Sequence, residues 1–465
     1  MKEYDFIVLG GGSAGYAAAS TATKLGLKVA VVEGGKEVGG LCILRGCMPS
    51  KALIESANRY LTLRRAAEFG LRAEEIAFCF DEIQARKNKL INEFAEYRRK
   101  QLESGRFDFY RGWASFTDPH TIEVKDLDGD TETLHSTTFL IATGSRLKKV
   151  PCIGLEETGY LTSDDVLNSK HVPKSVIVLG GGAIGIEFAH FYSALGSQVT
   201  ILQRSEQMLK EMDGDVALAL TDAFKHRGIR IYCHTQLHSA ECTAGGLKRV
   251  SFQQSGKLKH IDAEEIVYAL GREPQIDGLN LEQAGVDVTC GRITVASNQQ
   301  TNVPHIFAAG DVASNYEVVH IAIQEGELAA RNAAKLKHGA TASLEEIDYR
   351  LRLFAVFSSP EIATVGMTER ELQTAGVGYC VATYPFNDHG KSMVHGETEG
   401  FVKLLTAENT GEIVGAAVVG PHASELIHEI VVAMRFRATA ADLAQIPHYH
   451  PTLSEIWTYP AEELA

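Results

Sequence analysis

Residues 5–15 read DFIVLGGGSAG and decide the fold of the N-terminal part of the chain. The apolar run before the glycines is typical of a buried parallel strand, and an alanine-rich helical stretch that ends near Leu25 follows them. The same order recurs at residues 175–185, SVIVLGGGAIG, before a helical stretch that ends near Leu195. The sequence therefore predicts two units of the same kind, each with a strand, a glycine-rich turn and a helix.

Glycines at the spacing G-x-G-x-x-G have a physical role in binding a pyrophosphate. The first permits a tight turn, the second lets backbone N–H groups approach the phosphates, and the third lets the helix pack on the strand. The helix then points its positive dipole end at the phosphates. One copy alone is weak evidence, because such turns also occur for structural reasons, but two copies favour two dinucleotide sites. The glycines are Gly10, Gly12 and Gly15 in the first copy and Gly180, Gly182 and Gly185 in the second.

The residue that ends the second strand of each unit indicates which dinucleotide binds there. At residues 28–33, KVAVVE, the strand ends on Glu33, whose carboxylate can bind a ribose without a 2′-phosphate, as in FAD. In the second unit Gln203 takes this place, Arg204 follows it, and Lys210 lies further on. Loss of the acid and gain of cations favour NADPH over NADH, whereas the alternative leaves both cations as solvated surface charges.

Composition and charge exclude several classes of function. The 465 residues are too many for a single core, so a multidomain enzyme is expected. A net charge of -14 opposes binding to nucleic acid or to an anionic membrane, because both need clustered cations. No apolar stretch reaches the length of about 18 residues that suggests a membrane span. The protein is therefore expected to be cytoplasmic.

A pair of cysteines follows the first unit. Residues 39–51, GGLCILRGCMPSK, place Cys42 and Cys47 at a helix start, where they can close a small disulfide ring and where the helix dipole favours a thiolate. Metal binding is a rival, but no second cysteine pair and no nearby histidine completes a zinc site, so no metal is predicted. Two unrelated core cysteines are the remaining alternative. The other six are expected to be ordinary buried thiols: Cys79, Cys152, Cys233, Cys242, Cys290 and Cys380.

The motif G-G-x-C-x-x-x-G-C-x-P-S-K between two dinucleotide units resembles the pyridine nucleotide-disulfide oxidoreductases, and the resemblance covers essentially the whole chain. Further matches are ATGS at 142–145, AAGD at 308–311 and HPTLSE at 450–455. The resemblance implies a homodimer of α/β chains with Rossmann-like FAD and NAD(P) domains and a C-terminal α+β dimerisation domain. The expected boundaries are 1–147 and 273–345 for FAD, 148–272 for NAD(P), and 346–465 for dimerisation.

The same resemblance implies roles for the thiols and for a charged pair. Cys47 would lie next to the flavin, and Cys42 would exchange with the substrate. Lys51 and Glu187 match a pair beside the flavin, where a fixed positive charge favours the reduced, anionic flavin. The implied FAD-binding residues are Gly10, Gly12, Ser13, Ala14, Gly15, Glu33, Gly40, Thr143, Gly144, Gly310 and Asp311. Those for NAD(P) are Gly180, Gly182, Ile184, Gly185, Arg204, Lys210 and Gly271.

His450 and Glu455 match the acid-base pair that the partner subunit contributes in this family. An imidazole suits the task, because its unperturbed pKa of about 6.5 lets it take and return a thiol proton near neutral pH. Glu455 would hold the ring through its other nitrogen. His448 is the alternative histidine, but only His450 has the Pro-Thr and Glu spacing of the family.

Among the relatives, the local motifs are most similar to dihydrolipoamide dehydrogenase, as in HIAIQEG at 320–326. Leu44 departs from that pattern, because an asparagine usually stands there. A glutathione-reductase-like enzyme is an alternative, although Ala183 replaces the tyrosine that gates its nicotinamide pocket. The absence of any cysteine after Cys380 argues against a mercuric reductase.

Two further classes stay open: a flavin diaphorase or oxidase that does not use the cysteines, and a nucleotide-binding sensor subunit without turnover. The His450 and Glu455 pair favours dithiol chemistry over both. The expected substrate is therefore a small-molecule or protein-bound disulfide or dithiol.

Overall fold

The computed structural model describes residues 2–339 and 344–465, and the chain divides into two compact units. The first unit comprises Met1–Pro49, Arg86–Lys149 and Gly271–Asp348, and the second comprises Ser50–Ala85, Val150–Leu270 and Tyr349–Ala465. Residues 1 and 340–343, which belong to the predicted FAD-binding segments, lie outside the described residues. The boundaries of the three predicted domains remain predictions.

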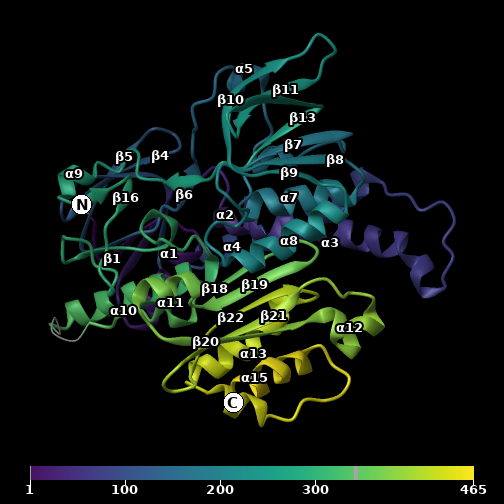
Figure 1. Cartoon of the computed structure of the whole chain (residues 1–465). Helices are drawn as coiled ribbons and strands as arrows, with labels where there is room; N and C mark the ends of the chain where they lie inside the picture. Colours follow the sequence, from purple (N-terminus) through teal and green to yellow (C-terminus); the bar gives the residue numbers. More distant parts are fainter. Residues whose placement is uncertain (1, 340–343) are drawn as a thin grey trace. The chain divides into compact units, whose positions relative to one another are not determined.

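The first unit is built on a six-stranded sheet (Figure 1). Strand β1 pairs in parallel with β2 on one side and β5 on the other, and β5 also pairs in parallel with β17. Strands β3, β4 and β5 form an antiparallel meander, which the glycine-rich motifs did not predict. The bounds are β1 (Lys2–Leu9), β2 (Val29–Glu33), β3 (Asp108–Asp118), β4 (Thr121–Asp126), β5 (Thr131–Ile141) and β17 (Ile306–Ala308).

Two helices of this unit cross at very close range. Helix α1 (Ser13–Lys24) packs on α10 (Val319–Lys337), and a Cβ atom on Gly326 would collide with the carbonyl oxygen of Ala14. Buried alanines of both helices, including Ala18 and Ala329, fill the same core. This packing fixes the N-terminus of α1 at the carboxyl end of β1, where dinucleotides bind in folds of this kind.

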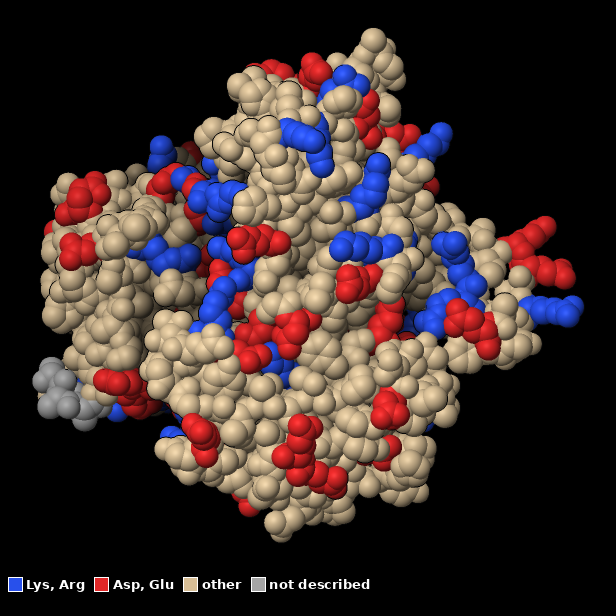
Figure 2. All heavy atoms as spheres, viewed as in Figure 1, with Lys and Arg blue, Asp and Glu red and all other residues tan. Residues whose placement is uncertain are grey.

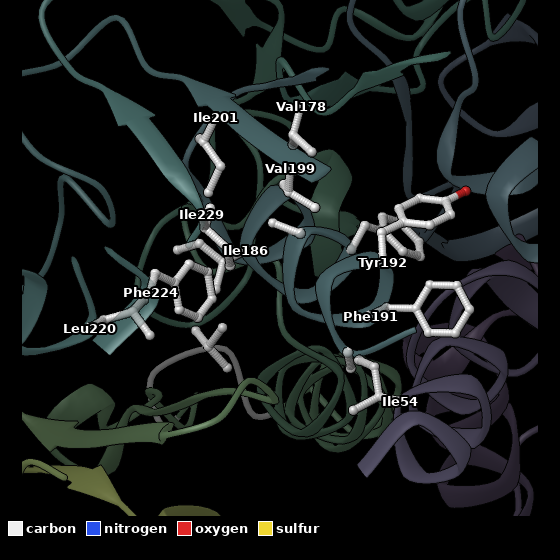
Figure 3. Close-up of a cluster of buried hydrophobic side chains, with 14 of the residues drawn as sticks. Ile54, Val178, Ile186, Phe191, Tyr192, Val199, Ile201, Leu220, Phe224 and Ile229 are labelled. Carbon is white, nitrogen blue, oxygen red and sulfur yellow. The ribbon is translucent and has the colours of Figure 1, made fainter. Parts of the chain in front are cut away.

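The second unit contains a parallel sheet of order β13-β7-β8-β9. Apolar side chains of this sheet pack on helices α3, α7 and α8, and Figure 3 shows them facing one another. The labelled members are Ile54, Val178, Ile186, Phe191, Tyr192, Val199, Ile201, Leu220, Phe224 and Ile229. The bounds are β7 (Ser175–Leu179), β8 (Gln198–Leu202), β9 (Arg230–Tyr232), β13 (Glu265–Tyr268), α3 (Cys47–Arg64), α7 (Ala183–Ala194) and α8 (Gly214–His226). The second predicted strand, turn and helix unit therefore packs into a core that also includes buried residues from the C-terminal part of the chain, such as Val356 and Ile362.

The C-terminal part of the second unit is an antiparallel sheet of order β18-β19-β22-β21-β20, with α13 packed on β19 and β22. Its core includes the fully buried Trp457, whose Nε1 donates a hydrogen bond to the carbonyl oxygen of Leu426. The bounds are β18 (Leu353–Val356), β19 (Glu361–Gly366), β20 (Tyr379–Pro385), β21 (Phe401–Ala407), β22 (Ile413–Gly420) and α13 (Ala423–Arg435).

A buried lysine joins this sheet to α8. Lys403 on β21 is 1% exposed, and its ammonium pairs with Asp213 at 3.1 Å, with Asp215 at 2.9 Å and with Glu369. Burial lowers the pKa of Lys403, but the bonds to Glu369 and Asp215 outweigh it and raise the pKa overall. The three carboxylates therefore surround an ammonium group, which explains why acids cluster here.

The remaining elements are short, apart from α4 and a three-stranded antiparallel sheet of β10, β11 and β12. They are α2 (Gly40–Arg45), η1 (Ala66–Phe69), α4 (Phe80–Leu102), β6 (Ser145–Leu147), α5 (Leu155–Thr158), α6 (Ser163–Leu167), β10 (Thr235–Cys242), β11 (Lys248–Gln254), β12 (Lys257–Ala263), β14 (Arg272–Pro274), α9 (Leu281–Ala284), β15 (Val288–Thr289), β16 (Arg292–Ile293), η2 (Gly310–Val312), η4 (Tyr349–Leu351), α11 (Glu369–Ala375), η5 (Phe386–Asp388), α12 (Gly390–His395), α14 (Ala440–Ala444), η6 (Ser454–Trp457) and α15 (Thr458–Leu464).

Acidic and basic side chains are interspersed over the face that Figure 2 shows. Among the described residues, no helix has both the length and the apolar character needed to cross a membrane. The cytoplasmic location stays a prediction from the sequence.

Candidate active site

The first glycine-rich turn has the backbone geometry that a bound pyrophosphate needs. Gly10 has φ +106°, and a Cβ atom there would collide with the carbonyl oxygen of Ala142, so only glycine fits. Gly15 packs on the carbonyl oxygen of Gly10, which leaves no room for a side chain. The carboxylate of Glu33 accepts hydrogen bonds from the N–H groups of Gly11 at 2.8 Å and Gly35 at 2.7 Å. Turn, helix and carboxylate are therefore locked together.

This turn opens onto a cavity of about 780 Å³ that lies entirely within the first unit. All the predicted FAD-binding residues except Gly15 line the cavity: Gly10, Gly12, Ser13, Ala14, Glu33, Gly40, Thr143, Gly144, Gly310 and Asp311. Gly144 has no atom within 4 Å of the position that a Cβ would take, so the backbone there faces open space. A volume of this size and a glycine-lined wall fit FAD.

Asp311 is held by Ser145 of the ATGS motif, and Ser145 is in turn bonded to Arg272, which the sequence did not single out. Its Oδ2 accepts a hydrogen bond from Ser145 Oγ at 2.6 Å, and Ser145 Oγ in turn accepts one from Arg272 Nε at 2.8 Å. Glu317 also lines the cavity, and burial together with the Asp311 charge raises the pKa of its carboxyl group. Two acids therefore face the cavity.

The two cysteines of the motif line the same cavity. Cys42 lies in the short helix α2, whereas Cys47 is the first residue of α3, so two helices replace the single helix start that the sequence predicts. Gly46 separates the helices, and a Cβ there would lie only 3.2 Å from the Cα of Cys42. Both sulfur-bearing side chains are half-buried. The chain bends at Gly46 between α2 and α3, and both cysteines line the wall of one cavity.

Lys51 and Glu187 form a tight ion pair in the second unit. Nζ of Lys51 lies 2.8 Å from each carboxylate oxygen of Glu187 and 4.7 Å from the centre of the Phe357 ring. The Phe357 N–H group also donates to Glu187 at 3.2 Å. Because the Glu187 side chain is only 8% exposed, these donors keep its buried charge compensated. The lysine is therefore held in one position.

The second glycine-rich turn has the same close backbone contacts as the first. Gly180 has φ +107°, and a Cβ there would collide with the carbonyl oxygen of Ala269, while Gly185 packs on Gly180. The position of Gly182 faces open space, and the Ile184 side chain is exposed on α7. Each turn therefore has the same close packing and the same open side.

Gln203 takes over the place of Glu33 in this second turn. Its Oε1 accepts the Gly181 N–H at 3.1 Å, and its Nε2 donates to the carbonyl oxygen of Gln207. Gln203 therefore accepts a hydrogen bond from the backbone of the turn, as Glu33 does, but its side chain carries no negative charge. Arg204 is exposed beside it, whereas Lys210 pairs with Glu211 on the surface at 3.0 Å. Gly271 belongs to the first unit, where its carbonyl oxygen accepts the Lys148 N–H.

The structure distinguishes between His450 and His448, the two candidates for the acid-base histidine. His450 is 80% exposed, and its Nδ1 lies 3.0 Å from Oε2 of the largely buried Glu455. With Nδ1 donating to a carboxylate, Nε2 of the neutral ring is left as the acceptor. His448 instead pairs through Nε2 with Glu429 at 2.7 Å and is 8% exposed. Only His450 therefore combines exposure with a contact to Glu455.

A second imidazole lies on the other side of Glu455. Nε2 of the fully buried His389 is 3.4 Å from Oε1 of Glu455, and its Nδ1 is 2.8 Å from Oγ of Ser392. Burial lowers the pKa of the His389 imidazole, while the Glu455 carboxylate counteracts that shift. The Glu455 carboxylate therefore lies between two imidazoles, and its hydrogen bond to Nδ1 orients the His450 ring.

With this geometry in place, the whole chain can be compared with known proteins. Residues 4–326 match the model of the pyridine nucleotide-disulphide oxidoreductases, and residues 354–461 match the dimerisation domain of that family. The chain belongs to the pyridine nucleotide-disulphide oxidoreductase family.

Within the family, the oxidoreductase is 34% identical to a dihydrolipoyl dehydrogenase of Bacillus subtilis, over 97% of this chain and 96% of the relative. It is 35% identical to the dihydrolipoyl dehydrogenase of Geobacillus stearothermophilus, over 99% and 96%. Among solved structures it resembles LpdA from Mycobacterium tuberculosis, with a TM-score of 0.88 and 28% identity over 100% of both chains. It also resembles a Cu(II) complex of the flavoprotein disulfide reductase RclA from Escherichia coli, with a TM-score of 0.86 and 25% identity over 100% of both chains.

These similarities confirm the predicted family, the α/β fold with a C-terminal dimerisation domain, and the function. The oxidoreductase is an FAD-dependent disulfide oxidoreductase of the dihydrolipoyl dehydrogenase kind. The family implies FAD and a pyridine nucleotide, and the dimerisation domain supports a homodimer.

One expectation about the other cysteines is wrong. None of the six is buried, and four are exposed, namely Cys79, Cys242, Cys290 and Cys380. Cys242 ends β10, Cys380 lies in β20 at the edge of its sheet, and Cys290 adopts φ +52° between β15 and β16. A thiol in an edge strand or a turn has no core to enter, so residue type alone misled the prediction.

Proposed function

We propose that this oxidoreductase passes electrons between a pyridine nucleotide and a disulfide or dithiol substrate through Cys42 and Cys47, with His450 as the acid-base group. The observation that carries the proposal is that both cysteines line the cavity whose walls carry the FAD motifs. Bound FAD supplies the two-electron exchange between the nucleotide and a sulfur atom. The residues of the chain then do the thiol chemistry.

The thiol steps need no reactant other than the reduced cysteine pair, His450 and the substrate. In disulfide reduction, the Cys42 thiolate attacks one substrate sulfur and breaks the substrate S–S bond, and the leaving thiolate takes a proton from His450. The Cys47 thiolate then attacks the Cys42 sulfur, which restores the Cys42–Cys47 disulfide and releases the second substrate thiolate. Oxidation of a dithiol follows the same steps in reverse, with His450 accepting the proton. The side chain of Glu455 keeps Nε2 of His450 available for both directions.

Lys51 acts by charge rather than by proton transfer. Its ion pair with Glu187 fixes the ammonium group, so no reorganisation is needed when negative charge develops next to it. We propose that this charge stabilises reduced FAD.

For the nucleotide, we propose a preference for NADPH through contacts of Arg204 with the 2′-phosphate. The support is the neutral Gln203 at the place of Glu33, together with the exposed guanidinium beside it. Charge-assisted contacts to phosphate contribute about 1.5 to 3 kcal/mol, so Arg204→Gln should raise the Kd for NADPH about tenfold or more and leave that for NADH nearly unchanged. Lys225→Gln, the same charge change at an exposed position of α8, is the control. A wild type that prefers NADH would contradict the idea.

The function itself is tested with the wild-type holoenzyme. Consumption of NADH and NADPH should be measured with lipoamide, glutathione disulfide and other small disulfides, and anaerobic reduction should show which nucleotide reduces FAD. We expect turnover with a lipoyl substrate in both directions. An enzyme that reduces quinones or oxygen at full rate but no disulfide would support the diaphorase alternative instead.

A further inference from the structure

The segment between β8 and α8, residues 203–213, packs against the second glycine-rich turn. The Leu209 N–H group donates a hydrogen bond to the carbonyl oxygen of Gly181 at 2.8 Å. The segment starts at Gln203, which takes the place of Glu33, so it lies on the side of the turn where the adenosine ribose of a dinucleotide is expected. We therefore name residues 203–213 the nucleotide loop.

The nucleotide loop contains one unfavourable backbone conformation. Leu209 has φ +47°, a left-handed conformation that costs free energy in any residue with a side chain. Met208 and Leu209 are buried, whereas the side chains of the next residues, Lys210 and Glu211, are exposed. The packing of the loop's own side chains therefore ends where its backbone is least favourable, and a neighbouring element is needed to hold it.

Arg370 on α11 supplies hydrogen bonds at this point. Its Nη1 donates to the carbonyl oxygen of Lys210 at 3.0 Å, and its Nη2 donates to the carbonyl oxygen of Glu211 at 3.3 Å. Nη2 also lies 3.4 Å from the Glu211 carboxylate, but this ion pair is exposed to solvent and contributes little. Because two of the acceptors are backbone carbonyl groups, Arg370 fixes the path of the chain rather than the position of one side chain.

Helix α11 is itself attached to the end of the nucleotide loop. The Glu369 N–H group donates to Oδ2 of Asp213 at 3.3 Å, and the buried Lys403 bonds to the carboxylates of both residues. In the first turn of the helix, Thr368 and Glu371 form a reciprocal capping box that fixes where the helix starts. Arg370 therefore reaches the loop from a fixed support.

We propose that Arg370 is a positioning residue for the pyridine nucleotide, because it holds the backbone of Lys210 and Glu211 in the conformation in which the nucleotide loop binds the adenosine end. A loop that is ordered before binding loses less conformational entropy when the nucleotide arrives, so binding is tighter. Arg370 lies within residues 354–461, which match the dimerisation domain, so that part of the chain contributes to nucleotide binding. This inference rests on the proposed nucleotide site at the second glycine-rich turn.

The test measures nucleotide binding to the oxidised holoenzyme of Arg370→Gln, whose side chain is uncharged and too short to reach both carbonyl oxygens. The probe is NAD⁺ or NADP⁺, whichever the wild type binds more tightly, so the outcome does not depend on the proposed preference for NADPH. We expect the Kd of that nucleotide to rise about fivefold, as for the loss of exposed hydrogen bonds. The KM for its reduced form should rise by a similar factor, whereas kcat and the KM for the disulfide should change less than about twofold.

A second measurement reports on the loop itself. Hydrogen exchange of the Leu209 amide should be faster in Arg370→Gln than in the wild type, because its hydrogen bond to Gly181 opens more often in a loop with less support. Saturating nucleotide should reduce the difference, since the ligand then holds the loop in place of Arg370.

Two further variants separate positioning from charge and from folding. Arg370→Lys keeps the charge but loses the fork of donors, so it should recover only part of the lost affinity. Arg437→Gln removes the same charge from an exposed arginine that bonds to Glu412 instead of the nucleotide loop, and it should leave the Kd unchanged. The FAD absorption and the thermal unfolding of each variant show whether it is folded.

The outcomes distinguish this inference from the function beneath it. An unchanged Kd in Arg370→Gln, or an equal rise in Arg437→Gln, would overturn the role of Arg370 and leave the proposed disulfide chemistry intact. A wild type that is reduced by a nucleotide but turns over no disulfide would contradict the proposed function, whereas a fivefold rise in Kd would still support the role of Arg370. Absence of nucleotide binding in the wild type would overturn both proposals.

Discussion

Replacing Cys47 by serine should abolish both disulfide turnover and the long-wavelength absorption band of the two-electron-reduced enzyme. If Cys47 is next to the flavin, its thiolate donates charge to oxidised FAD, and a serine at this position has no sulfur to do so. Cys42→Ser should also abolish disulfide turnover, because the exchange needs two sulfurs, but it should keep the band by leaving the Cys47 thiolate uncombined. Absorption spectra under anaerobic titration measure the band, and lipoamide reduction measures turnover.

The control for this pair is Cys290→Ser, which changes an exposed cysteine of the same unit that does not line the cavity. It should leave both the band and the turnover unchanged. Nucleotide-dependent reduction of an artificial acceptor should continue in all three variants. A Cys42→Ser enzyme with full disulfide turnover would remove the cysteine pair from the mechanism.

The glycine-rich turns could be predicted because their chemistry is local. At Gly10 and Gly180 the backbone passes so close to a carbonyl oxygen of another segment that a Cβ atom would collide with it, so only glycine fits. The carbonyl oxygens belong to distant residues, Ala142 and Ala269, but the residue that must be glycine lies in a short motif of consecutive residues that can be recognised in the sequence. His450 and Glu455 could also be paired from the sequence, because they are only five residues apart.

Contacts between distant segments could not be predicted in the same way. His389 reaches Glu455, and Arg370 reaches the backbone of Lys210, only because the packing of separate helices and strands brings them together. Neither residue stands in a recognisable motif.

Replacing His450 by alanine should slow dithiol exchange by roughly 10² to 10⁴-fold at neutral pH, the usual contribution of a positioned acid-base group. Reduction of FAD by the nucleotide should persist, because that step does not use the imidazole. The loss should shrink at high pH, where substrate thiols ionise without help. Rates of lipoamide reduction and of dihydrolipoamide oxidation, each measured against pH, check these expectations.

The matched control for this variant is His448→Asn, since His448 lies two residues away and pairs with Glu429 rather than Glu455. It should retain most of the activity, although loss of the partly buried hydrogen bond to Glu429 should lower stability. Glu455→Gln should fall between the two histidine variants in rate, because the amide can still orient the ring but cannot stabilise the imidazolium that forms when His450 takes a proton. Unimpaired turnover in His450→Ala, together with a large loss in His448→Asn, would transfer the acid-base role to His448. That result would also mean that contact with Glu455 is not what selects the catalytic histidine.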